Sequence, residues 1–361
     1  FGPIQMGDTA LPNRIVMAPL TRNRAVAGLR PGELTVEYYR QRASAGLIIA
    51  EATQINPMGQ GYLDTPGIYS QEQVAAWRKV TDAVHGAGGR IFLQLWHVGR
   101  IAHSSLLPGG AAPVSSTDRR PRAMTFAATG FVEVSQPRAL RDEEIPGLIE
   151  DYRKAARNAA DAGFDGVEVH SANNYLLEQF LRDSVNNRTG PYGGSIANRT
   201  RLVIEVMQAV AQEIGAGCVG IRLSPITTFN DSPRYSDPQA LYDHLVEQLA
   251  TLDIAYVHVI QGETGGPRYP EDAVVPFDYG ALKACFNGCW MVNNGYGKED
   301  AMAAIASGEA DLVAFGRPFI SNPDLVRRLR EDAALNPLQE DKLYGGGAEG
   351  YTDYPTLDKA G

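Results

Sequence analysis

The sequence predicts an α/β fold, and more specifically a closed (β/α)8 TIM barrel. Eight short apolar runs rich in β-branched residues alternate along the chain with longer stretches of helical periodicity. Such alternation favours parallel strands, arranged either as an open doubly wound sheet or as a closed barrel. Because the chain has eight such units in 361 residues, the barrel is the favoured arrangement.

The predicted strands and helices follow one another in a regular order. The strands lie at residues 15–19, 47–54, 91–96, 166–170, 219–225, 256–261, 289–294 and 312–318. The helices lie at residues 33–44, 71–85, 145–162, 197–214, 238–252, 279–286, 298–307 and 323–331. In the second helix, Val74, Trp77, Val80 and Val84 recur at helical spacing. Glycines such as Gly163 close several of these stretches, as C-caps often do.

Two segments fall outside the eight units. Residues 1–14 predict an N-terminal hairpin that closes the end of the barrel opposite the active-site mouth. Residues 97–140 follow the third strand and are too long and too rich in Pro, Ser and Arg for a simple loop, so they predict an inserted, lid-like segment. The whole chain, residues 1–361, is predicted to form a single barrel domain.

The composition excludes several classes of partner. The 33 Lys and Arg residues against 42 Asp and Glu give a net charge of −9, so the chain has no general attraction for nucleic acid or anionic lipid. No apolar run approaches the ~18 residues of a membrane helix. Cys218, Cys285 and Cys289 suggest neither a disulfide framework nor a zinc site. We therefore expect a cytoplasmic protein without a metal that acts on small molecules.

Polar side chains interrupt strands that should be almost wholly apolar. Thr21 lies just beyond the first strand, Gln94 and Arg222 lie within the third and fifth, and His170 ends the fourth. The carboxyl ends of barrel strands converge on one mouth, where active sites sit. Together these side chains predict a flat, hydrogen-bonding ligand with one electron-rich edge.

Arg222 taken alone has two interpretations. A guanidinium keeps its charge and is not buried without an anion or several acceptors. That anion could belong to a ligand, or it could be Glu168 or Glu51 on nearby strands, in which case Arg222 would form an internal ion pair.

The last two strands predict a phosphate site. Asn294 and Gly295 follow the seventh strand, and Gly316 and Arg317 follow the eighth. Glycines let backbone N–H groups approach a phosphate closely, and these two loops commonly bind phosphate in this fold. The alternative is a pair of ordinary turns, but the arginine beside Gly316 favours phosphate.

His170, Asn173 and Tyr175 form a third group, at the end of the fourth strand. The histidine and the amide, three residues apart, can both donate to one oxygen, and the phenol can give up a proton. The alternative is a capped helix start with a buried tyrosine. A metal site is not predicted, because no second histidine or carboxylate lies nearby at ligand spacing.

Several motifs together resemble the Old Yellow Enzyme family of FMN-dependent ene-reductases, and in particular the bacterial branch that includes pentaerythritol tetranitrate reductase and morphinone reductase. The motifs are Met-Ala-Pro-Leu-Thr-Arg at 17–22, Gln-Leu-Trp-His-Val-Gly-Arg at 94–100, His-Ser-Ala-Asn-Asn-Tyr-Leu at 170–176, Tyr-Gly-Gly-Ser at 192–195, Phe-Gly-Arg-Pro at 315–318 and Gly-Tyr-Thr-Asp-Tyr-Pro at 350–355. The resemblance covers essentially the whole chain.

The resemblance implies a non-covalent FMN across the barrel mouth. It implies cofactor contacts from Pro19, Leu20, Thr21, Ala52, Gln94, Arg222, Asn294, Gly295, Gly316 and Arg317. Among these, Thr21 would meet the flavin O4 and Arg222 the N1 and O2 edge.

The resemblance also implies the activity. NADPH or NADH would act as a diffusible reductant, and an activated C=C bond of an α,β-unsaturated carbonyl or nitro compound would be reduced by ping-pong hydride transfer through flavin N5. His170 and Asn173 would bind the substrate oxygen and Tyr175 would protonate the α-carbon. Substrate contacts would come from Tyr62, Trp96, His170, Asn173, Asn230 and Tyr344. The family implies a monomer or a homodimer.

Two other readings of the residues remain open. A phosphate-binding lyase or isomerase would use a Schiff-base lysine or paired carboxylates, yet no lysine lies in a predicted strand. A non-catalytic flavin-binding barrel would not need Tyr175 together with His170 and Asn173. Two Gly-x-Gly-x-x-Gly patterns, at 215–220 and 345–350, lack the strand–turn–helix context of a dinucleotide site.

Overall fold

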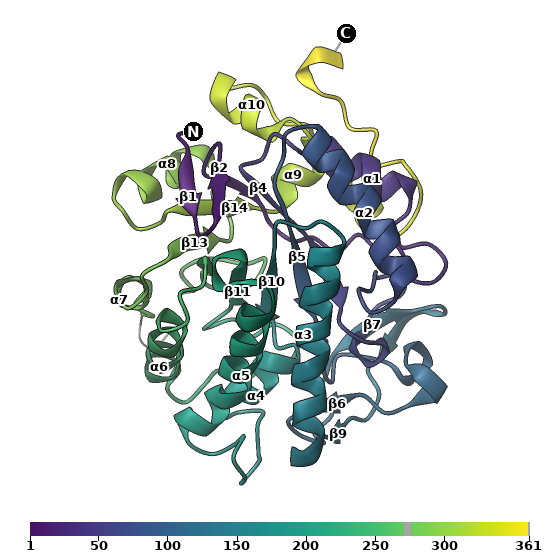
Figure 1. Ribbon diagram of the computed structural model, residues 1–361, viewed down its shortest axis with the longest axis vertical. Coiled ribbons are helices and arrows are strands. Elements are labelled where there is room, and N and C mark those ends of the chain that lie inside the picture. The colour runs from purple at the N-terminus through teal and green to yellow at the C-terminus, as the bar shows by residue number, and fades with distance from the viewer. Residues whose placement is uncertain (271–275, 360–361) are drawn as a thin grey trace.

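The computed structural model describes residues 1–270 and 276–359 and contains a closed barrel of eight parallel strands (Figure 1). The strands are β3 (Ile15–Met17), β4 (Leu47–Gln54), β5 (Ile91–Trp96), β10 (Gly166–Ser171), β11 (Val219–Leu223), β12 (Tyr256–Ile260), β13 (Cys289–Asn293) and β14 (Leu312–Phe315). Each pairs with its neighbours along the chain, and β14 closes onto β3. The predicted barrel and all eight strands are confirmed, although five strands end earlier than predicted.

The barrel strands are buried on both faces, which explains their nearly continuous apolar sequences. Every residue of β4 is buried, and so is every residue of β5. Inside the barrel, Val16, Ile49, Phe92 and Met291 pack together. A polar side chain in such a strand therefore needs a partner inside the barrel or at its mouth.

An N-terminal hairpin closes one end of this barrel. β1 (Ile4–Met6) pairs antiparallel with β2 (Thr9–Leu11). Met6 and Leu11 are fully buried and belong to the same apolar cluster as Leu47, the first residue of β4. The hairpin thus covers the amino ends of the strands, as predicted, and leaves the carboxyl ends as the mouth.

Helices surround the barrel (Figure 1). They are α1 (Glu33–Arg40), α2 (Gln71–Gly86), α3 (Ile145–Asp161), α4 (Leu176–Leu181), α5 (Ile196–Ile214), α6 (Pro238–Ala250), α7 (Tyr279–Ala284), α8 (Lys298–Ala306), α9 (Arg317–Ser321) and α10 (Leu325–Glu331). A capping box of Ser70 and Gln73 begins α2. Gly163, with φ of +86°, ends the α3 region in a conformation that suits glycine.

The sequence does not predict α9, and it offers α4 only as an alternative. The prediction for the last strand extends to residue 318, whereas the chain turns into α9 at Arg317, next to a proline that favours a helix start. After the fourth strand, Tyr175 is buried and is the N-cap of α4, so the alternative of a helix start with a buried tyrosine is present in the structure. Both helices are too short for a helical period to stand out in the sequence.

Residues 97–140 pack against the mouth. They form the small pairs β6 (Val114–Ser115) with β9 (Arg138–Ala139) and β7 (Met124–Ala127) with β8 (Gly130–Glu133). Val134 is buried in one cluster with Trp96 and Tyr175, and the Leu63 N–H donates to the Phe126 carbonyl at 2.8 Å. Figure 1 shows this segment at the lower right, away from β1 and β2 at the upper left.

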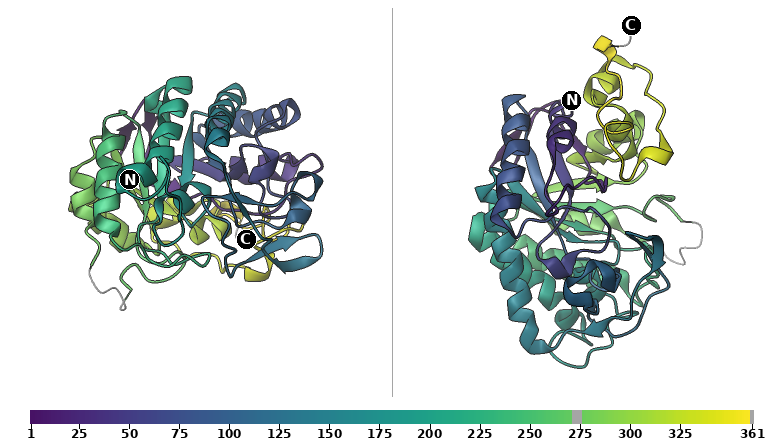
Figure 2. Two further views of the ribbon diagram at one scale, coloured as in Figure 1. Left: turned by 90° about the horizontal axis from the view of Figure 1, so that it is seen from below. Right: turned by 90° about the vertical axis from the view of Figure 1, so that its right-hand side faces the viewer.

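The C-terminal segment returns to the start of the barrel. Its residues, yellow in Figure 2, lie beside the helices that follow β14. Arg22 and Arg24, just beyond β3, donate hydrogen bonds to backbone carbonyls of residues 342–350. This stretch, called here the tail loop, carries Tyr344.

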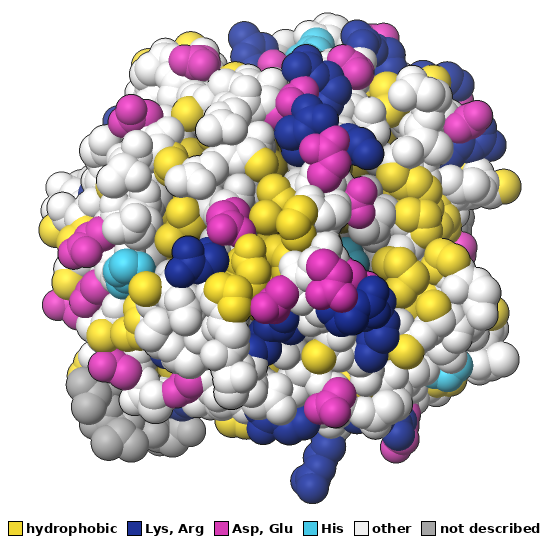
Figure 3. All heavy atoms as spheres, turned by 60° about the horizontal axis from the view of Figure 1, so that its bottom comes forward, with side chains coloured by type: hydrophobic (Ala, Val, Ile, Leu, Met, Phe, Trp, Pro, Cys, Tyr) yellow, Lys and Arg dark blue, Asp and Glu magenta, His cyan; other side chains and the backbone are white. Residues whose placement is uncertain are grey.

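None of the helices within residues 1–270 and 276–359 combines the length and the apolar character needed to cross a membrane. On the face drawn in Figure 3, basic and acidic side chains are interspersed.

Candidate active site

Four aromatic rings gather where β4, β5 and β10 end. The Trp96 and His170 rings lie nearly parallel, with centroids 6.2 Å apart. Tyr175 meets both rings edge-on, at 5.0 Å and 5.1 Å. Tyr62 stacks on Trp96, with the two ring centroids 5.7 Å apart. The structure therefore brings together four residues that the sequence assigns to substrate binding and proton transfer.

The turn after β10 explains how Tyr175 reaches this group. Asn173 and Asn174 both adopt left-handed backbone conformations, with φ of +55° and +56°. Asparagine tolerates this conformation better than most residues. The turn reverses the chain immediately after the strand, and Tyr175 becomes the N-cap of α4. His170, Asn173 and Tyr175 thus converge although they span only six residues.

His170 is a neutral hydrogen-bond donor. Its Nδ1 accepts a bond from the Ala172 N–H at 3.3 Å, which places the ring proton on Nε2. Burial lowers the pKa of His170 well below its ordinary value, and the nearby charge of Arg222 adds to this effect. The imidazole therefore stays neutral at physiological pH with Nε2–H free to donate.

Asn173 is oriented by its neighbours. The Thr264 hydroxyl donates to Asn173 Oδ1 at 2.6 Å, and the Asn173 backbone N–H donates to Ser224 Oγ at 2.8 Å. Asn230 Nδ2 donates to the Asn173 carbonyl at 2.9 Å. Because Oδ1 is engaged, the amide presents Nδ2 as a donor, and no partner for that nitrogen lies among residues 1–270 or 276–359.

Tyr175 is held as a protonated phenol. Its hydroxyl lies 2.8 Å from that of Tyr62. Burial raises the pKa of Tyr175 to about 12, against the hydrogen bonds from Tyr62 and Asn230, and the neighbouring Tyr344 phenol raises it further. Asn230 and Tyr344, both predicted to contact substrate, therefore lie beside Tyr175. Tyr344 is 64% exposed and borders the site from the tail loop.

Arg222 is a buried cation with spare donors. Its Nη2 donates to Asn293 Oδ1 at 2.8 Å, whereas its buried Nε has no hydrogen-bond partner. No ion pair joins Arg222 to Glu168 or Glu51 in the described part of the chain, so the predicted internal-pair alternative is wrong. Burial lowers the pKa of Arg222, and the charge of Glu168 opposes that shift. The unpaired Nε calls for an acceptor from outside the chain.

Gln94 and Thr21 complete this side of the mouth. Gln94 is buried and donates from Nε2 to Glu168 Oε1 at 2.8 Å, which leaves its Oε1 as an acceptor. The Thr21 hydroxyl has no partner within the described ranges of the chain. Ala52 lies at an irregularity of β4, where its pairing register with β5 shifts, and it packs with Trp96. A bulge of this kind redirects a side chain.

In the loops after β13 and β14, two glycines have free space beside their backbone, where a ligand could approach. A Cβ atom added to Gly295 would meet nothing within 4 Å, and one added to Gly316 would meet only Leu20 Cδ2 at 3.5 Å. Arg317 is exposed and makes no ion pair within the described residues. The Asn294 side chain donates to three carbonyls of residues 261–266, so only its backbone remains for a phosphate.

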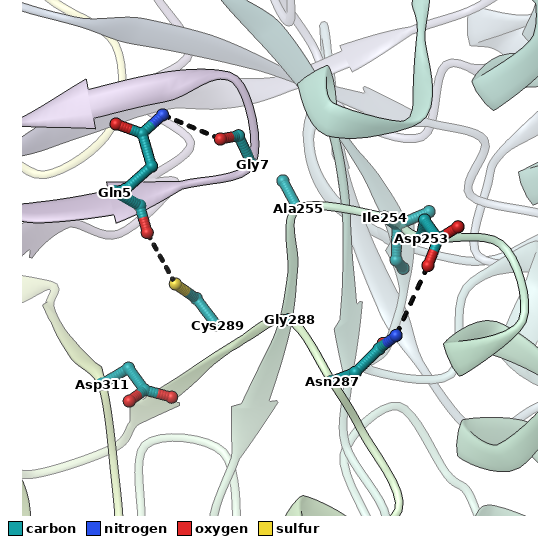
Figure 4. A pocket seen from close by; sticks show the side chains of 9 residues that line it. All are labelled: Gln5, Gly7, Asp253, Ile254, Ala255, Asn287, Gly288, Cys289 and Asp311. Atoms are coloured by element: carbon teal, nitrogen blue, oxygen red, sulfur yellow. Dashed lines mark hydrogen bonds between the residues drawn. The ribbon is translucent and has the colours of Figure 1, made fainter.

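A pocket at the other end of the barrel has a different character (Figure 4). It is lined by Gln5, Gly7, Asp253, Ile254, Ala255, Asn287, Gly288, Cys289 and Asp311. Its polar contacts join its own lining, for example Cys289 Sγ to the Gln5 carbonyl. None of the predicted site residues lies in it. Within the described ranges, no group of three or more His, Cys, Asp or Glu side chains could hold a metal ion.

Sequence reasoning overlooked three sets of supporting residues. Glu168, considered only as a partner for Arg222, instead fixes Gln94. Thr264 fixes the Asn173 amide. Arg24 and its neighbour at position 22 hold the tail loop. The charged Glu168 inside an apolar strand was a visible signal, but the other contacts join segments hundreds of residues apart or within loops, where no local pattern exists.

Comparisons of this chain with a family model and with known proteins point to the same protein family. The model of the NADH:flavin oxidoreductase / NADH oxidase family matches residues 1–336. The chain is 47% identical to 12-oxophytodienoate reductase 1 of Oryza sativa subsp. japonica, over 99% of this chain and 93% of that protein. It is 44% identical to 12-oxophytodienoate reductase 2 of Arabidopsis thaliana, over 99% and 95% of the two chains.

Solved structures agree with these relatives. The Old Yellow Enzyme homologue of Zymomonas mobilis superposes with a TM-score of 0.95 at 43% identity, over 99% of both chains. Morphinone reductase in complex with tetrahydroNAD superposes with a TM-score of 0.93 at 45% identity, over 99% of this chain and 97% of that one.

The residues present fit FMN. Its ring has an electron-rich edge that suits the unpaired Nε of Arg222, and its phosphate suits the open backbone at Gly295 and Gly316 beside Arg317. Family, fold and site agree: the chain belongs to the NADH:flavin oxidoreductase / NADH oxidase family, the Old Yellow Enzyme family, and is an FMN-dependent NAD(P)H oxidoreductase.

Proposed function

We propose that this enzyme is an ene-reductase that uses NADPH or NADH to reduce the activated C=C bond of α,β-unsaturated carbonyl or nitro compounds. The observation that carries the proposal is the convergence of His170, Asn173 and Tyr175 on one turn. Two neutral donors and one protonated phenol are the groups that such a reduction requires. A barrel that only stored flavin would not need them.

We place FMN across the mouth of the barrel. Arg222 and Gln94 would meet the polar edge of the ring, and the backbone of Gly295 and Gly316 would hold the phosphate together with Arg317. The orphaned Arg222 Nε and the space above the two glycines support this placement. When bound, FMN supplies a hydride acceptor for NAD(P)H and a hydride donor for the β-carbon of the substrate.

Two side chains of the protein would bind the substrate oxygen and stabilise its charge. His170 Nε2–H and Asn173 Nδ2–H donate to the carbonyl or nitro oxygen, and they stabilise the negative charge that develops there as hydride arrives. Both donors are fixed in advance, His170 by Ala172 and Asn173 by Thr264. Preorganised donors of this kind need no rearrangement during the reaction.

Tyr175 supplies the remaining proton. With a pKa of about 12 it is fully protonated at neutral pH and can act as a general acid toward the α-carbon. Its ring meets His170 edge-on, so the acid lies beside the oxygen-binding group. Tyr62, Trp96 and Tyr344 form an aromatic border that suits a planar, conjugated substrate.

An anaerobic experiment tests the proposal. The purified holoenzyme is reduced with NADPH and, separately, NADH, then mixed with 2-cyclohexenone, a maleimide or a nitroalkene. We expect reoxidation of the flavin and formation of the saturated product, seen by absorbance and by product analysis. If oxygen reoxidises the reduced enzyme but none of the three alkenes does, the ene-reductase proposal fails.

A further inference from the structure

A buried carboxylate, that of Glu168, lies beneath the mouth, and so far only its contact with Gln94 has been described. Glu168 lies in β10, two residues before His170, and its side chain has no exposed surface. It accepts hydrogen bonds from Gln94 Nε2 at 2.8 Å, from the Tyr256 hydroxyl at 3.0 Å and from His258 Nδ1 at 2.8 Å. Three donors on two other strands of the barrel, β5 and β12, thus point at one carboxyl group.

Glu168 is ionised. Burial alone would raise its pKa, but the contact with His258, the charge of Arg222 and the Tyr256 hydrogen bond together hold the pKa below its ordinary value. Burial lowers the pKa of His258 despite this carboxylate, so the imidazole is neutral and donates from Nδ1. The pair therefore carries one net negative charge inside the barrel.

This charge fixes the orientation of Gln94. An ionised carboxylate only accepts hydrogen bonds, so the Gln94 amide must turn its nitrogen toward Glu168 and its Oε1 away. Without the carboxylate, the amide could flip and present a different pattern of donors and acceptors. The orientation of the one glutamine predicted to meet the flavin is thus set from the barrel interior.

The same charge acts on Arg222. Residues His170, Arg222 and His258 are register partners across β10, β11 and β12, so their side chains lie on the same face of neighbouring strands. Glu168 attracts the guanidinium without pairing with it, and the Arg222 Nε stays unpaired. The carboxylate offsets part of the positive charge that Arg222 presents at the mouth.

We propose that Glu168 is a positioning residue for the flavin, which orients the amide of Gln94 and partly offsets the charge of Arg222, and thereby lowers the reduction potential of the bound FMN. The inference rests on the placement of FMN proposed above. It assigns Glu168 two separable effects. The length of its side chain fixes the amide of Gln94, and its negative charge partly offsets the charge of Arg222.

Glu168→Gln tests the charge. The new amide keeps an acceptor oxygen, and its N–H can donate to His258 Nδ1 once the imidazole proton moves to Nε2, which is unpaired in the structure. The loss of one negative charge favours the reduced, anionic flavin. We expect the preference of the protein for reduced over oxidised FMN to rise by about tenfold, equivalent to roughly 30 mV for a two-electron couple.

Glu168→Asp tests the shape. It keeps the charge but withdraws the carboxylate by one methylene, which releases Gln94. We expect a reduction potential close to wild type and FMN binding roughly tenfold weaker, the order of one charge-assisted hydrogen bond. Tyr256→Phe is the matched control, because it removes a neutral donor from the same carboxylate and should leave the potential unchanged.

The measurements are the FMN reduction potential by dye-coupled titration, the FMN dissociation constant and the melting temperature of each variant. A Glu168→Gln protein with lowered melting temperature but a wild-type potential would overturn the inference, provided that Arg222→Ala shifts the potential. If neither Glu168→Gln nor Arg222→Ala shifts the reduction potential, the placement of FMN itself is wrong. Should Glu168→Gln not fold, wild-type FMN affinity in Glu168→Asp would still overturn the inference.

Discussion

The hydroxyl oxygens of Tyr62 and Tyr175 lie 2.8 Å apart, although the two residues are separated by 113 positions in the chain. Tyr62 comes from the connection between β4 and β5, and Tyr175 from the turn after β10. One hydroxyl donates to the other, so the hydroxyl of the proposed acid belongs to a part-buried, hydrogen-bonded pair. Trp96 stacks on the Tyr62 ring and meets the Tyr175 ring edge-on, so it contacts both members of the pair.

Tyr175→Phe is the most direct test of the proposed acid. The substitution keeps the ring that packs on Trp96 and removes only the proton. Flavin reduction by NADPH needs no proton from this group, so it should stay near the wild-type rate. Reoxidation by 2-cyclohexenone should slow by ~10²–10⁴-fold, the usual effect of a positioned general acid. Stopped-flow spectroscopy of each half-reaction separates the two steps.

Tyr62→Phe serves as its control. It removes the hydrogen-bond partner of Tyr175 and leaves the acid in place, so the loss with 2-cyclohexenone should stay below roughly tenfold. Equal losses in the two variants would mean that the acid is Tyr62 or a group held by both. Wild-type enone reduction by Tyr175→Phe would remove Tyr175 from the mechanism.

His170→Ala and Asn173→Ala should both weaken the binding of phenols and enones. Each variant removes one donor to the same oxygen, and each should cost about 1–2 kcal/mol of binding free energy. Titration of the oxidised holoenzyme with a phenol, followed by visible absorbance, gives the dissociation constant. Thr264→Val, which only frees the Asn173 amide, should have a smaller effect. Unchanged affinity in both alanine variants would place the ligand oxygen elsewhere.

The oxidative half-reaction should be independent of pH between about pH 6 and pH 9. Burial lowers the pKa of His170 well below its ordinary value, so we expect the imidazole to stay neutral in this window. Burial raises the pKa of Tyr175 to about 12, so the phenol stays protonated throughout it. The rate of reoxidation by 2-cyclohexenone, measured by stopped flow across the window, checks this. A sigmoidal change within it would show that one of the two groups titrates there.

Arg222→Ala should weaken FMN binding and lower the flavin reduction potential. The guanidinium supplies a charge-assisted contact in a buried site, worth about 1.5–3 kcal/mol, and more for the anionic reduced flavin than for the oxidised one. Redox titration and FMN release on dilution measure both effects. Arg90→Ala, at the amino end of β5, is the control. Full FMN occupancy at an unchanged potential would contradict the proposed contact.

Arg24→Ala should loosen the tail loop. Its guanidinium donates to the carbonyls of Lys342, Leu343, Gly347 and Glu349, which border Tyr344. We expect faster proteolysis in the tail loop and a KM for bulky enones raised by roughly tenfold, with little change in flavin reduction. Arg30→Ala, whose guanidinium bonds only a local carbonyl, is the control. Proteolysis at the wild-type rate would mean that Arg22 alone suffices.

The sequence predicts most of the barrel because the barrel strands are buried on both faces. Strands such as β4 then stand out as apolar runs, and polar residues within them, such as Arg222, stand out in turn. Helix α9 escapes prediction, and α4 is predicted only as an alternative helix start, because both are shorter than two turns. Their positions depend on turns that reverse the chain after β10 and β14.

The site itself is predictable only in part. His170, Asn173 and Tyr175 are close in sequence, so one motif reveals them together. The contact between Tyr62 and Tyr175, and the support of Asn173 by Thr264, join distant segments and depend on the closed barrel. No single-sequence pattern encodes which of two facing hydroxyls or amides will meet. Resemblance to a family supplied the candidate Tyr62, and the geometry supplied its partner.

The bonds from Arg22 and Arg24 to residues 342–350 also set an order of events during synthesis. The two arginines directly follow β3, yet the carbonyls that accept their hydrogen bonds are made some 320 residues later. At about 5–20 residues per second, that interval lasts tens of seconds. Strand β14, which closes the barrel, is complete some 27 residues earlier, but until then the aromatic border lacks Tyr344. The loop that carries Tyr344 can therefore take its place at the mouth only after all eight barrel strands have been synthesised.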